Sequence, residues 1–334
     1  MEHARKDSGK ASFPVQIIVM ALIMTGITSR LAGQVITTET AIQRATEQFE
    51  STPLKTSSLS AQVFMFSGDG GNVVAIVDNG STLLIDSGVD SRSTELDHAV
   101  FNATARPVTR LVNTHCHFDH IGGNVFFGAS GVTIIAQENV KKRLSSPQNV
   151  ALIGLRDGPY PTQALPTVDY ASSMQLRQGS QDLTLMNYGP AHTDGDTVIY
   201  IAPANIAVVG DIFSNAFYPI IDTSLGGSID GIIHTVDQIL ARTDDQTKIV
   251  PGHGPVATRA DLEKYRDMLV QVRERVQTLI ATGKTMDQTV RAAPTKEFDA
   301  NWGSGYVPAD VFTEMVFTSL SNPQKAATAR VVLH

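Results

Sequence analysis

Four residues that can bind a metal ion occur within six positions of this sequence. The segment His115–His120 reads His-Cys-His-Phe-Asp-His, and it contains three histidines and one aspartate. Histidine is a common zinc ligand, and two histidines one residue apart can reach the same ion from a tight turn. Gly122 and Gly123 follow directly and let the backbone wrap closely around such a site. The spacing therefore predicts a metal site.

Three further candidate ligands follow predicted strands later in the chain. His192 lies in Pro-Ala-His-Thr-Asp-Gly-Asp, Asp211 in Val-Val-Gly-Asp, and His253 in Val-Pro-Gly-His-Gly. Residues that follow strands can meet at one edge of a sheet, where loops carry chemistry on a rigid support. Seven ligands suit two metal ions and leave room for a hydroxide between them.

The elements that must position these residues are predicted from apolar periodicity and turn signals. Short apolar runs begin at residue 62, and Asn79-Gly80 between two of them predicts a hairpin. Helices are expected over 93–103, from 229, and from 258, where Thr258 and Asp261 resemble a capping box. Further strands are expected over residues 109–113, 133–136, 183–186, 198–201, 206–209 and 248–250. This alternation predicts an α/β fold.

The N-terminal segment has the layout of a secretory signal peptide. Arg5, Lys6 and Lys10 precede an uncharged apolar run over 13–27, and cleavage is expected near Gly33. The run is short for a membrane span, so we expect a periplasmic or secreted protein with no stable membrane anchor after cleavage. The expected organisation is a signal peptide over 1–33, an N-terminal helix and linker over 34–61, and a catalytic domain over 62–334 with C-terminal helices from about 258.

The charge balance argues for a small-molecule substrate rather than nucleic acid. The chain has 26 Lys plus Arg against 33 Asp plus Glu, which gives a net charge of -7 and no general attraction to phosphate backbones. Cys116 is the only cysteine, so no intrachain disulfide can form. We expect its side chain to pack away from the metals. The sequence does not indicate an oligomeric state.

The order of these motifs resembles that of the metallo-β-lactamase superfamily, over about residues 62–255. The resemblance implies a four-layer αβ/βα sandwich. It also implies a role for each ligand: the first metal would be held by His115, His117 and His192, and the second by Asp119, His120 and His253, with Asp211 bridging both. Asp86, in an Ile-Asp-Ser-Gly turn, matches the superfamily's early aspartate and is expected to support the ligands through hydrogen bonds.

The expected chemistry is hydrolysis by a metal-bound hydroxide. Two Zn²⁺ ions that share a water lower its pKa toward neutrality, although His and carboxylate ligands also accept manganese or iron. Asp119 and Asp211 are the expected catalytic carboxylates, and Asp119 would orient the hydroxide or relay its proton. Tyr218 follows Asp211 in the loop Asn-Ala-Phe-Tyr-Pro, where it would either donate to a developing oxyanion or pack beside Pro219.

The substrate is predicted from one departure within the ligand set. A cysteine fills one position of the second metal in the best-known zinc β-lactamases, and that position resembles Asp211 here, as in lactonases and glyoxalase II-like thioesterases. We therefore expect hydrolysis of a carboxylic ester or lactone, such as an N-acyl-homoserine lactone. The alternatives are a β-lactam, a thioester, and a non-catalytic zinc-binding protein, which would require the loss of a ligand.

Overall fold

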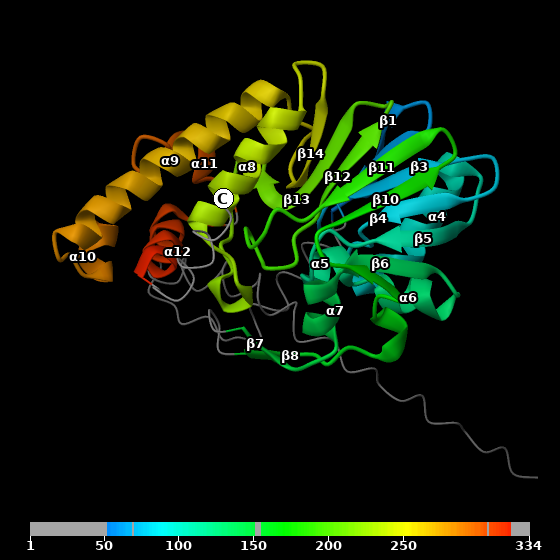
Figure 1. Ribbon diagram of the computed structural model, residues 1–334, viewed down its shortest axis with the longest axis horizontal. Helices are drawn as coiled ribbons and strands as arrows, with labels where there is room; N and C mark the ends of the chain where they lie inside the picture. The colour runs from blue at the N-terminus through cyan, green and yellow to red at the C-terminus, as the bar shows by residue number, and fades with distance from the viewer. Residues whose placement is uncertain (1–51, 69, 151–154, 306, 322–334) are drawn as a thin grey trace, which may run out of the picture.

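The computed structural model describes residues 52–68, 70–150, 155–305 and 307–321 (Figure 1). The predicted signal peptide and the N-terminal helix expected after it lie outside these residues, so the localisation stays a prediction. Within the described ranges, no helix combines the length and the apolar character needed to cross a membrane.

The first sheet has seven strands in the spatial order β1-β2-β3-β4-β5-β6-β9. Its strands are β1 (Lys55–Ser60), β2 (Val63–Ser67), β3 (Val73–Val77), β4 (Thr82–Ile85), β5 (Val108–Val112), β6 (Thr133–Gln137) and β9 (Val168–Tyr170). The strands β1 to β4 pair antiparallel, and the predicted Asn79-Gly80 turn joins β3 to β4. From β4 to β9 the pairing is parallel, so helix α4 (Ser93–Thr104) crosses over between β4 and β5.

The expected linker over 34–61 contains a strand instead of an irregular connection. Strand β1 pairs antiparallel with β2 and forms an edge of the first sheet, so this sheet begins before residue 62. Its residues, Lys-Thr-Ser-Ser-Leu-Ser, are mostly exposed, and only Leu59 is buried. An edge strand that packs on little else needs few apolar residues, and for that reason apolar patterning did not reveal it.

The second sheet has five strands in the order β10-β11-β12-β13-β14. They are β10 (Ser173–Gln178), β11 (Gln181–Met186), β12 (Val198–Ala202), β13 (Ile206–Ser214) and β14 (Lys248–His253). The pairing is antiparallel up to β13, whereas β13 and β14 are parallel and are joined through helix α8 (Ile229–Arg242). A separate short pair consists of β7 (Gln148–Val150) and β8 (Leu155–Asp157).

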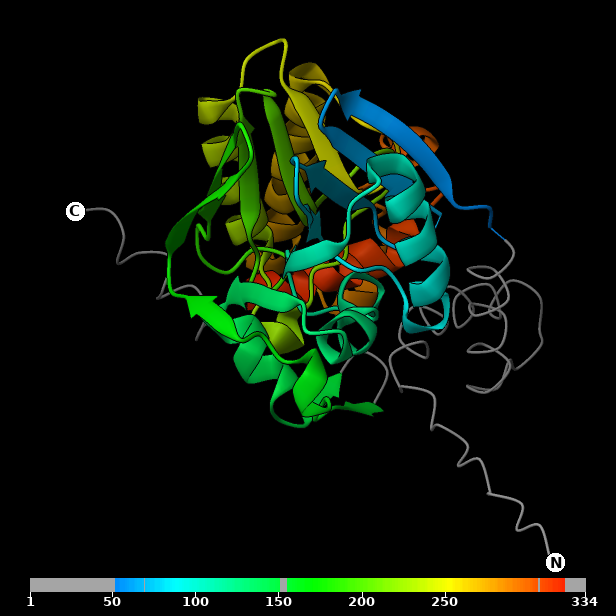
Figure 2. The same cartoon turned by 90° about the vertical axis from the view of Figure 1, so that its right-hand side faces the viewer.

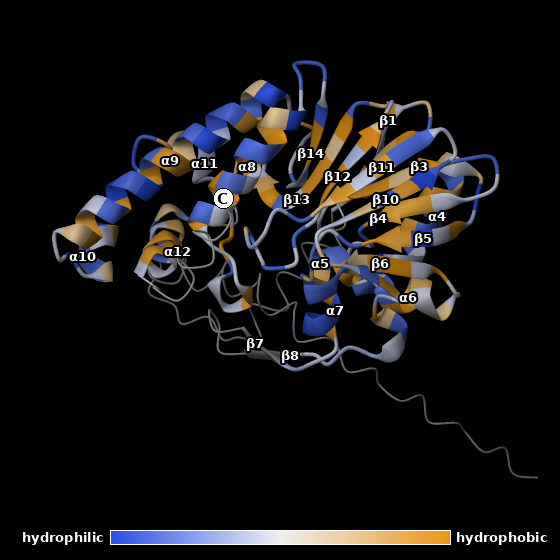
Figure 3. Ribbon diagram, in the orientation of Figure 1, coloured by the Kyte–Doolittle hydropathy of each residue, from blue (hydrophilic) through white to orange (hydrophobic). Residues whose placement is uncertain are grey.

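The two sheets pack face to face around a central apolar core (Figure 2). In β13, Ile206 and Val208 point into this core, while Ala207 and Val209 point to the outer face. Because side chains alternate along a strand, strands that are covered on both faces are mostly apolar. Figure 3 shows this as orange strands inside and blue helix surfaces outside.

Helices cover the outer face of each sheet and complete the predicted four-layer αβ/βα sandwich. On the first sheet, α4 and α6 (Asn124–Ala129) contribute Leu96, Val100 and Phe127 to the outer core. On the second sheet, α8, α9 (Arg259–Ala281) and α12 (Ala309–Ser321) enclose a larger core.

Short helices and one capping motif complete the architecture. The predicted capping box is confirmed, because Thr258 and Asp261 reciprocally cap the start of α9. The remaining helical segments are α5 (Phe118–Ile121), α7 (Glu138–Leu144), α10 (Met286–Arg291), α11 (Asp299–Trp302) and the 3₁₀ turns η1 (Asp90–Arg92), η2 (Thr162–Ala164) and η3 (Thr223–Leu225).

Helix α8 offers a direct test of this packing. Ile232 is fully buried in the outer core, whereas His234, two residues on, is exposed. We expect Ile232→Ala to lower the free energy of unfolding by about 2–5 kcal/mol, because the cavity it leaves cannot fully collapse. His234→Ala should change it by less than about 0.5 kcal/mol. Urea unfolding of the metal-free protein measures both, and equal effects would contradict the packing described for α8.

Candidate metal centre

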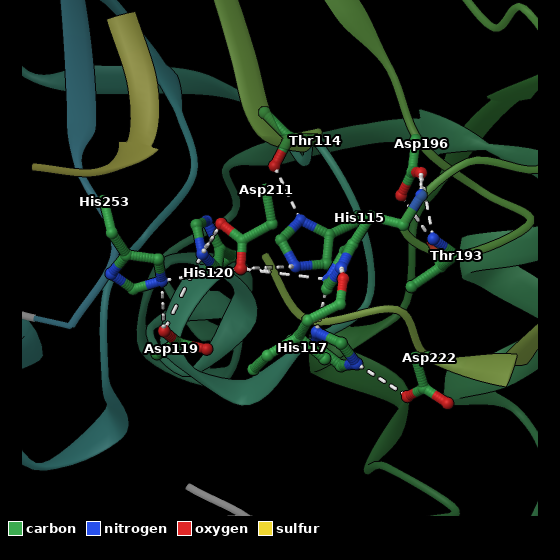
Figure 4. Close-up of polar contacts among 12 residues, drawn as sticks. Thr114, His115, His117, Asp119, His120, Thr193, Asp196, Asp211, Asp222 and His253 are labelled. Carbon is green, nitrogen blue, oxygen red and sulfur yellow. Dashed lines mark hydrogen bonds and ion pairs between the residues drawn. The ribbon is translucent and has the colours of Figure 1, made fainter. Parts of the chain in front are cut away.

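The seven predicted ligands come together at one place between the two sheets (Figure 4). From the first sheet, the segment after β5 carries His115 and His117 and leads into α5, which carries Asp119 and His120. From the second sheet, His192 follows β11, while Asp211 and His253 lie within β13 and at the end of β14. Both strands extend beyond their predicted ends, so these two ligands belong to strands rather than to the following loops.

The ligand atoms form two groups. His115, His117, His192 and Asp211 form the first group, and Asp119, His120 and His253 form the second; within each, the ligand atoms lie within 4.8 Å of one another. We call these the first and second ligand groups. They have the composition that the resemblance implied.

Asp211 contacts both groups. Its Oδ1 lies 3.1 Å from Nε2 of His120 in the second group. Its Oδ2 lies 3.9 Å from Nε2 of His115 and 3.8 Å from Nε2 of His192, both in the first group. The same oxygen is 3.5 Å from Nε2 of His253. The predicted bridging position of Asp211 therefore agrees with the geometry.

Buried polar atoms without hydrogen bonds indicate that this donor set suits cations. Within the described ranges, six buried side-chain nitrogen or oxygen atoms have no hydrogen-bond partner, and four of them belong to the ligands. They are Nε2 of His115, Oδ2 of Asp119, Nε2 of His120 and Oδ1 of Asp211. Buried polar groups are nearly always satisfied, so this concentration of lone pairs fits a place where cations bind.

Hydrogen bonds on the far side of each ring determine which nitrogen faces inward. Nδ1 of His115 contacts Thr114 Oγ1 (3.0 Å), and Nδ1 of His120 contacts Asp86 Oδ2 (2.8 Å). Nδ1 of His192 contacts the Ile220 carbonyl (2.8 Å). In each of these rings, Nε2 is left for a metal. The His117 ring has the opposite orientation, with Nε2 outward and Nδ1 inward. Its Nε2 lies 3.0 Å from Asp222 Oδ2, and its Nδ1 lies 2.9 Å from Nε2 of His192. Such outer contacts fix the tautomer and orientation of ligating histidines.

Asp86 occupies the supporting position that was predicted for it. Its Oδ1 accepts from the Thr114 amide at 2.7 Å, and its Oδ2 accepts from the Thr114 hydroxyl at 2.7 Å while also contacting His120. Burial raises the pKa of Asp86, against the opposing effect of His120. Its φ of 64° is uncommon for a non-glycine residue and is set by the turn after β4.

In the metal-free protein, the two histidines of the second ligand group have raised pKa values, which favour their positively charged form. Burial lowers the pKa of His253, but the carboxylates of Asp211 and Asp119 outweigh burial and raise it to about 10. The pKa of His120 is likewise raised, against burial, by Asp211, Asp119 and Asp86. Burial also opposes ionisation of Asp211, yet His253 and His120 hold its pKa well below the usual range. A divalent cation would bring the same sign of charge to the same carboxylates.

Two histidines of the first ligand group, His115 and His192, have lowered pKa values, which favour their neutral form. Burial, together with the charge of His120, lowers the pKa of His115 well below its usual value. Burial and the charge of His117 lower the pKa of His192 to about 4. His117 differs, because the hydrogen bond and charge of Asp222 outweigh burial and raise its pKa. His115 and His192 therefore present lone pairs at neutral pH, which is the state that a metal ligand requires.

Two glycines allow the backbone to lie directly against the ligands. A Cβ on Gly71 would lie 2.2 Å from Cε1 of His120, and the amide of Gly71 donates to the Asp119 carbonyl at 3.1 Å. A Cβ on Gly252 would lie 1.8 Å from Oδ1 of Asp211. Neither position has room for a side chain.

Two aspartates at the site were not identified from the sequence. Asp196 accepts from the amides of His192 (2.6 Å) and Thr193 (2.9 Å), and burial raises its pKa to about 7. It stands in the same motif as His192, so that motif could have indicated it. Asp222 contacts His117 from outside all the motifs, and no local pattern signals it.

The structure places Tyr218 among the C-terminal helices and Cys116 in an apolar cluster. Tyr218 is buried, its hydroxyl donates to Asp299 Oδ1 (2.9 Å) and to the Thr295 carbonyl (3.3 Å), and its ring stacks on Phe312. The hydroxyl is therefore engaged inside the C-terminal helices, which favours the packing alternative for Tyr218 over the oxyanion donor. The Cys116 side chain lies in a small apolar cluster, as expected.

Comparison with known proteins assigns this arrangement to a family. Residues 67–253, more than half of the chain, match the profile of the Metallo-beta-lactamase superfamily. The chain is 25% identical over 215 residues to a Metallo-beta-lactamase type 2 of Bacillus cereus, which covers 61% of this chain and 75% of that protein. It is 28% identical over 186 residues to a Hydroxyacylglutathione hydrolase of Polaromonas sp., which covers 54% of this chain and 60% of that protein.

Solved structures show the same fold. A metallo-beta-lactamase from Pontibacter korlensis superposes with a TM-score of 0.56 at 19% identity, over 65% of this chain and 99% of the other. The DIM-1 metallo-beta-lactamase gives a TM-score of 0.53 at 18% identity, over 66% and 99%. At such identities the likeness concerns the fold alone.

The close approach of Gly71 to His120 predicts a selective metal defect. We expect Gly71→Ala to displace the His120 ring and to weaken the binding of one of two cations by at least about tenfold. Gly80→Ala is the matched control, because a Cβ there meets only Asp78 Oδ1, at 3.7 Å. Zinc titration against a chromogenic chelator measures both variants. Two unchanged affinities in Gly71→Ala would contradict the geometry.

The buried position of Tyr218 predicts a stability effect without a kinetic one. Tyr218→Phe removes the two hydrogen bonds of the hydroxyl and leaves the Asp299 carboxylate short of a donor, so we expect a loss of about 1–3 kcal/mol in unfolding free energy. The kcat of any reaction that the wild type catalyses should stay within about twofold. A drop in kcat of a hundredfold or more, the size expected for a lost oxyanion donor, would restore the catalytic role.

Proposed function

The chain belongs to the metallo-beta-lactamase superfamily, and on that premise we propose that it is a dinuclear metal-dependent hydrolase of small carboxylic esters or lactones. The position of Asp211 supports the proposal, because its carboxylate lies 3.1 Å from His120 of the second ligand group and 3.8 Å from His192 of the first. The only cysteine in the sequence, Cys116, packs in an apolar cluster. The ligands are therefore histidines and carboxylates, as in the lactonase and glyoxalase II-like branches.

Zinc is the proposed metal, with two ions per chain. Three histidine nitrogens and one carboxylate suit zinc in the first ligand group, although manganese or iron would also accept this donor set. When bound, two such ions would polarise a scissile carbonyl and lower the pKa of a shared water.

Asp119 is the proposed proton carrier of the reaction. Its Oδ2 lies 3.1 Å from Nε2 of His253 and 3.7 Å from Nε2 of His120, and it has no hydrogen-bond partner of standard geometry. It can therefore accept a proton from the attacking water and pass it to the leaving oxygen of an ester. Asp211 has a different role: its position between the groups fixes how far apart they lie.

The relatives favour two alternative substrates. Similarity to the Bacillus cereus protein supports a β-lactam, and similarity to the Polaromonas protein supports a thioester. Both relatives are less than 30% identical to this chain, so neither name decides the substrate. A non-catalytic metal-binding protein is a weaker proposal, since every predicted ligand is in one of the two groups.

A substrate panel tests the proposal. Metal-analysed protein is assayed with a short and a long acyl-homoserine lactone, a simple aryl ester, a chromogenic cephalosporin and lactoylglutathione. We expect kcat/KM for a lactone or ester to exceed that for the cephalosporin and the thioester by at least about tenfold, which equals about 1.4 kcal/mol of transition-state stabilisation. If the cephalosporin or the thioester gave the higher kcat/KM, the class of that compound would replace esters and lactones as the proposed substrate.

The proposed role of Asp119 predicts a large kinetic effect. We expect Asp119→Asn to lower kcat by about 10²–10⁴-fold, because an amide cannot carry the proton. His117→Ala should remove nearly all activity by disrupting the first ligand group. Asp230→Asn, on the exposed face of α8, is the control with unchanged kcat. Near-normal turnover by folded Asp119→Asn would contradict this mechanism.

A further inference from the structure

The segment Ile220–Asp222 contacts two histidines of the first ligand group at three points. The Ile220 carbonyl accepts from Nδ1 of His192 at 2.8 Å, and the Asp222 amide donates to the His192 carbonyl at 3.1 Å. The Asp222 carboxylate oxygen Oδ2 lies 3.0 Å from Nε2 of His117. One short stretch of chain after β13 therefore holds both rings.

The Asp222 carboxylate, whose contact with His117 is drawn in Figure 4, is itself held in a fixed orientation. Its Oδ1 accepts from the amides of Ser224 (3.0 Å) and Leu225 (3.1 Å) and from the Ser224 hydroxyl (2.5 Å), where it caps the turn η3. Only Oδ2 is then directed at His117. A Cβ on Gly227 would lie 2.2 Å from the His192 carbonyl, so the same loop packs tightly against the backbone of that ligand.

The contact with Asp222 reverses the orientation of the His117 ring relative to the other histidines of its group. When the ring is neutral, donation from Nε2 to the carboxylate leaves Nδ1, which faces His192, as the nitrogen with the free lone pair. Asp86 makes the equivalent contact in the second ligand group, where it binds Nδ1 of His120. Each ligand group therefore has a histidine whose ring contacts an aspartate outside the seven ligands: Asp222 for His117 and Asp86 for His120.

From this geometry we propose that Asp222 is a positioning residue that sets the cation affinity of the first ligand group, independently of Asp86. The inference rests on the proposed metal binding. Removal of an outer carboxylate from a ligating histidine commonly costs about 10–100-fold in metal affinity. The contacts of Asp222 reach only His117 and His192 among the ligands, so the cost falls on one cation and not on both.

A purely structural role for Asp222 is the competing explanation, since its carboxylate also caps η3. Ser224→Ala separates the two explanations, because it removes one hydrogen bond to Oδ1 and leaves the contact with His117 in place. Asp222→Asn keeps the size of the side chain. Its amide cannot satisfy His117 and the two backbone donors at once, because the group that replaces one carboxylate oxygen is itself a donor.

The experiment measures zinc affinity in two sensitised backgrounds. In His120→Ala, which disrupts the second ligand group, we expect Asp222→Asn to weaken the binding of the remaining zinc ion about 10–100-fold. In His115→Ala, which disrupts the first, the same change should alter the affinity by less than about twofold. Ser224→Ala should leave both values within about twofold. In His115→Ala, Asp86→Asn should weaken the binding of the remaining ion where Asp222→Asn does not, because Asp86 contacts His120 directly.

A second readout does not depend on bound metal. In the metal-free protein, ¹⁵N NMR of His117 should show Nε2 protonated whenever the ring is neutral, and Asp222→Asn should shift the population toward the other tautomer. Unchanged affinity and an unchanged tautomer in folded Asp222→Asn would overturn the inference, as would equal losses at both ions. If the wild type bound no divalent cation, the proposed function would fail, while the tautomer of His117 would still test the positioning role.

Discussion

The structure depends on one buried carboxylate that contacts histidines from both halves of the sandwich. Asp211 lies on β13 of the second sheet, yet its Oδ1 is 3.1 Å from His120, which follows the first sheet. A buried carboxylate costs several kcal/mol unless positive charge compensates it. Histidine protons meet this requirement in the metal-free protein, and divalent cations would meet it in the loaded one. The two sheets must therefore hold their edges in one relative position.

The surrounding elements follow from that requirement. The central apolar core fixes the two sheets against each other, and glycines at positions 71 and 252 let neighbouring backbone lie against His120 and Asp211. Asp86 and Asp222 then orient one ring in each ligand group from outside. The candidate ligands lie at or near a few strand ends, while most of the chain forms the rigid support that holds these ends in place.

The candidate ligands that the fold brings together could be found in the sequence because their signals are local. His115 to His120 form one short motif, Asp211 and His253 stand beside glycines after recognisable strands, and His192 lies in a short polar motif after another strand. The remaining features depend on distant contacts. Strand β1 is polar and is defined by its pairing with β2. The hydroxyl of Tyr218 donates to Asp299, which is 81 residues away in the sequence. Asp222 meets His117 across 105 residues, so no spacing rule could reveal it.

The central claim is that Asp211 lies between two cations. X-ray diffraction of zinc-loaded crystals at the zinc absorption edge tests this most directly, because the anomalous signal locates each ion without reference to the protein. The account predicts two peaks about 3.5–4 Å apart, one in each ligand group, with the Asp211 carboxylate between them. A single peak, or peaks away from these seven residues, would contradict it.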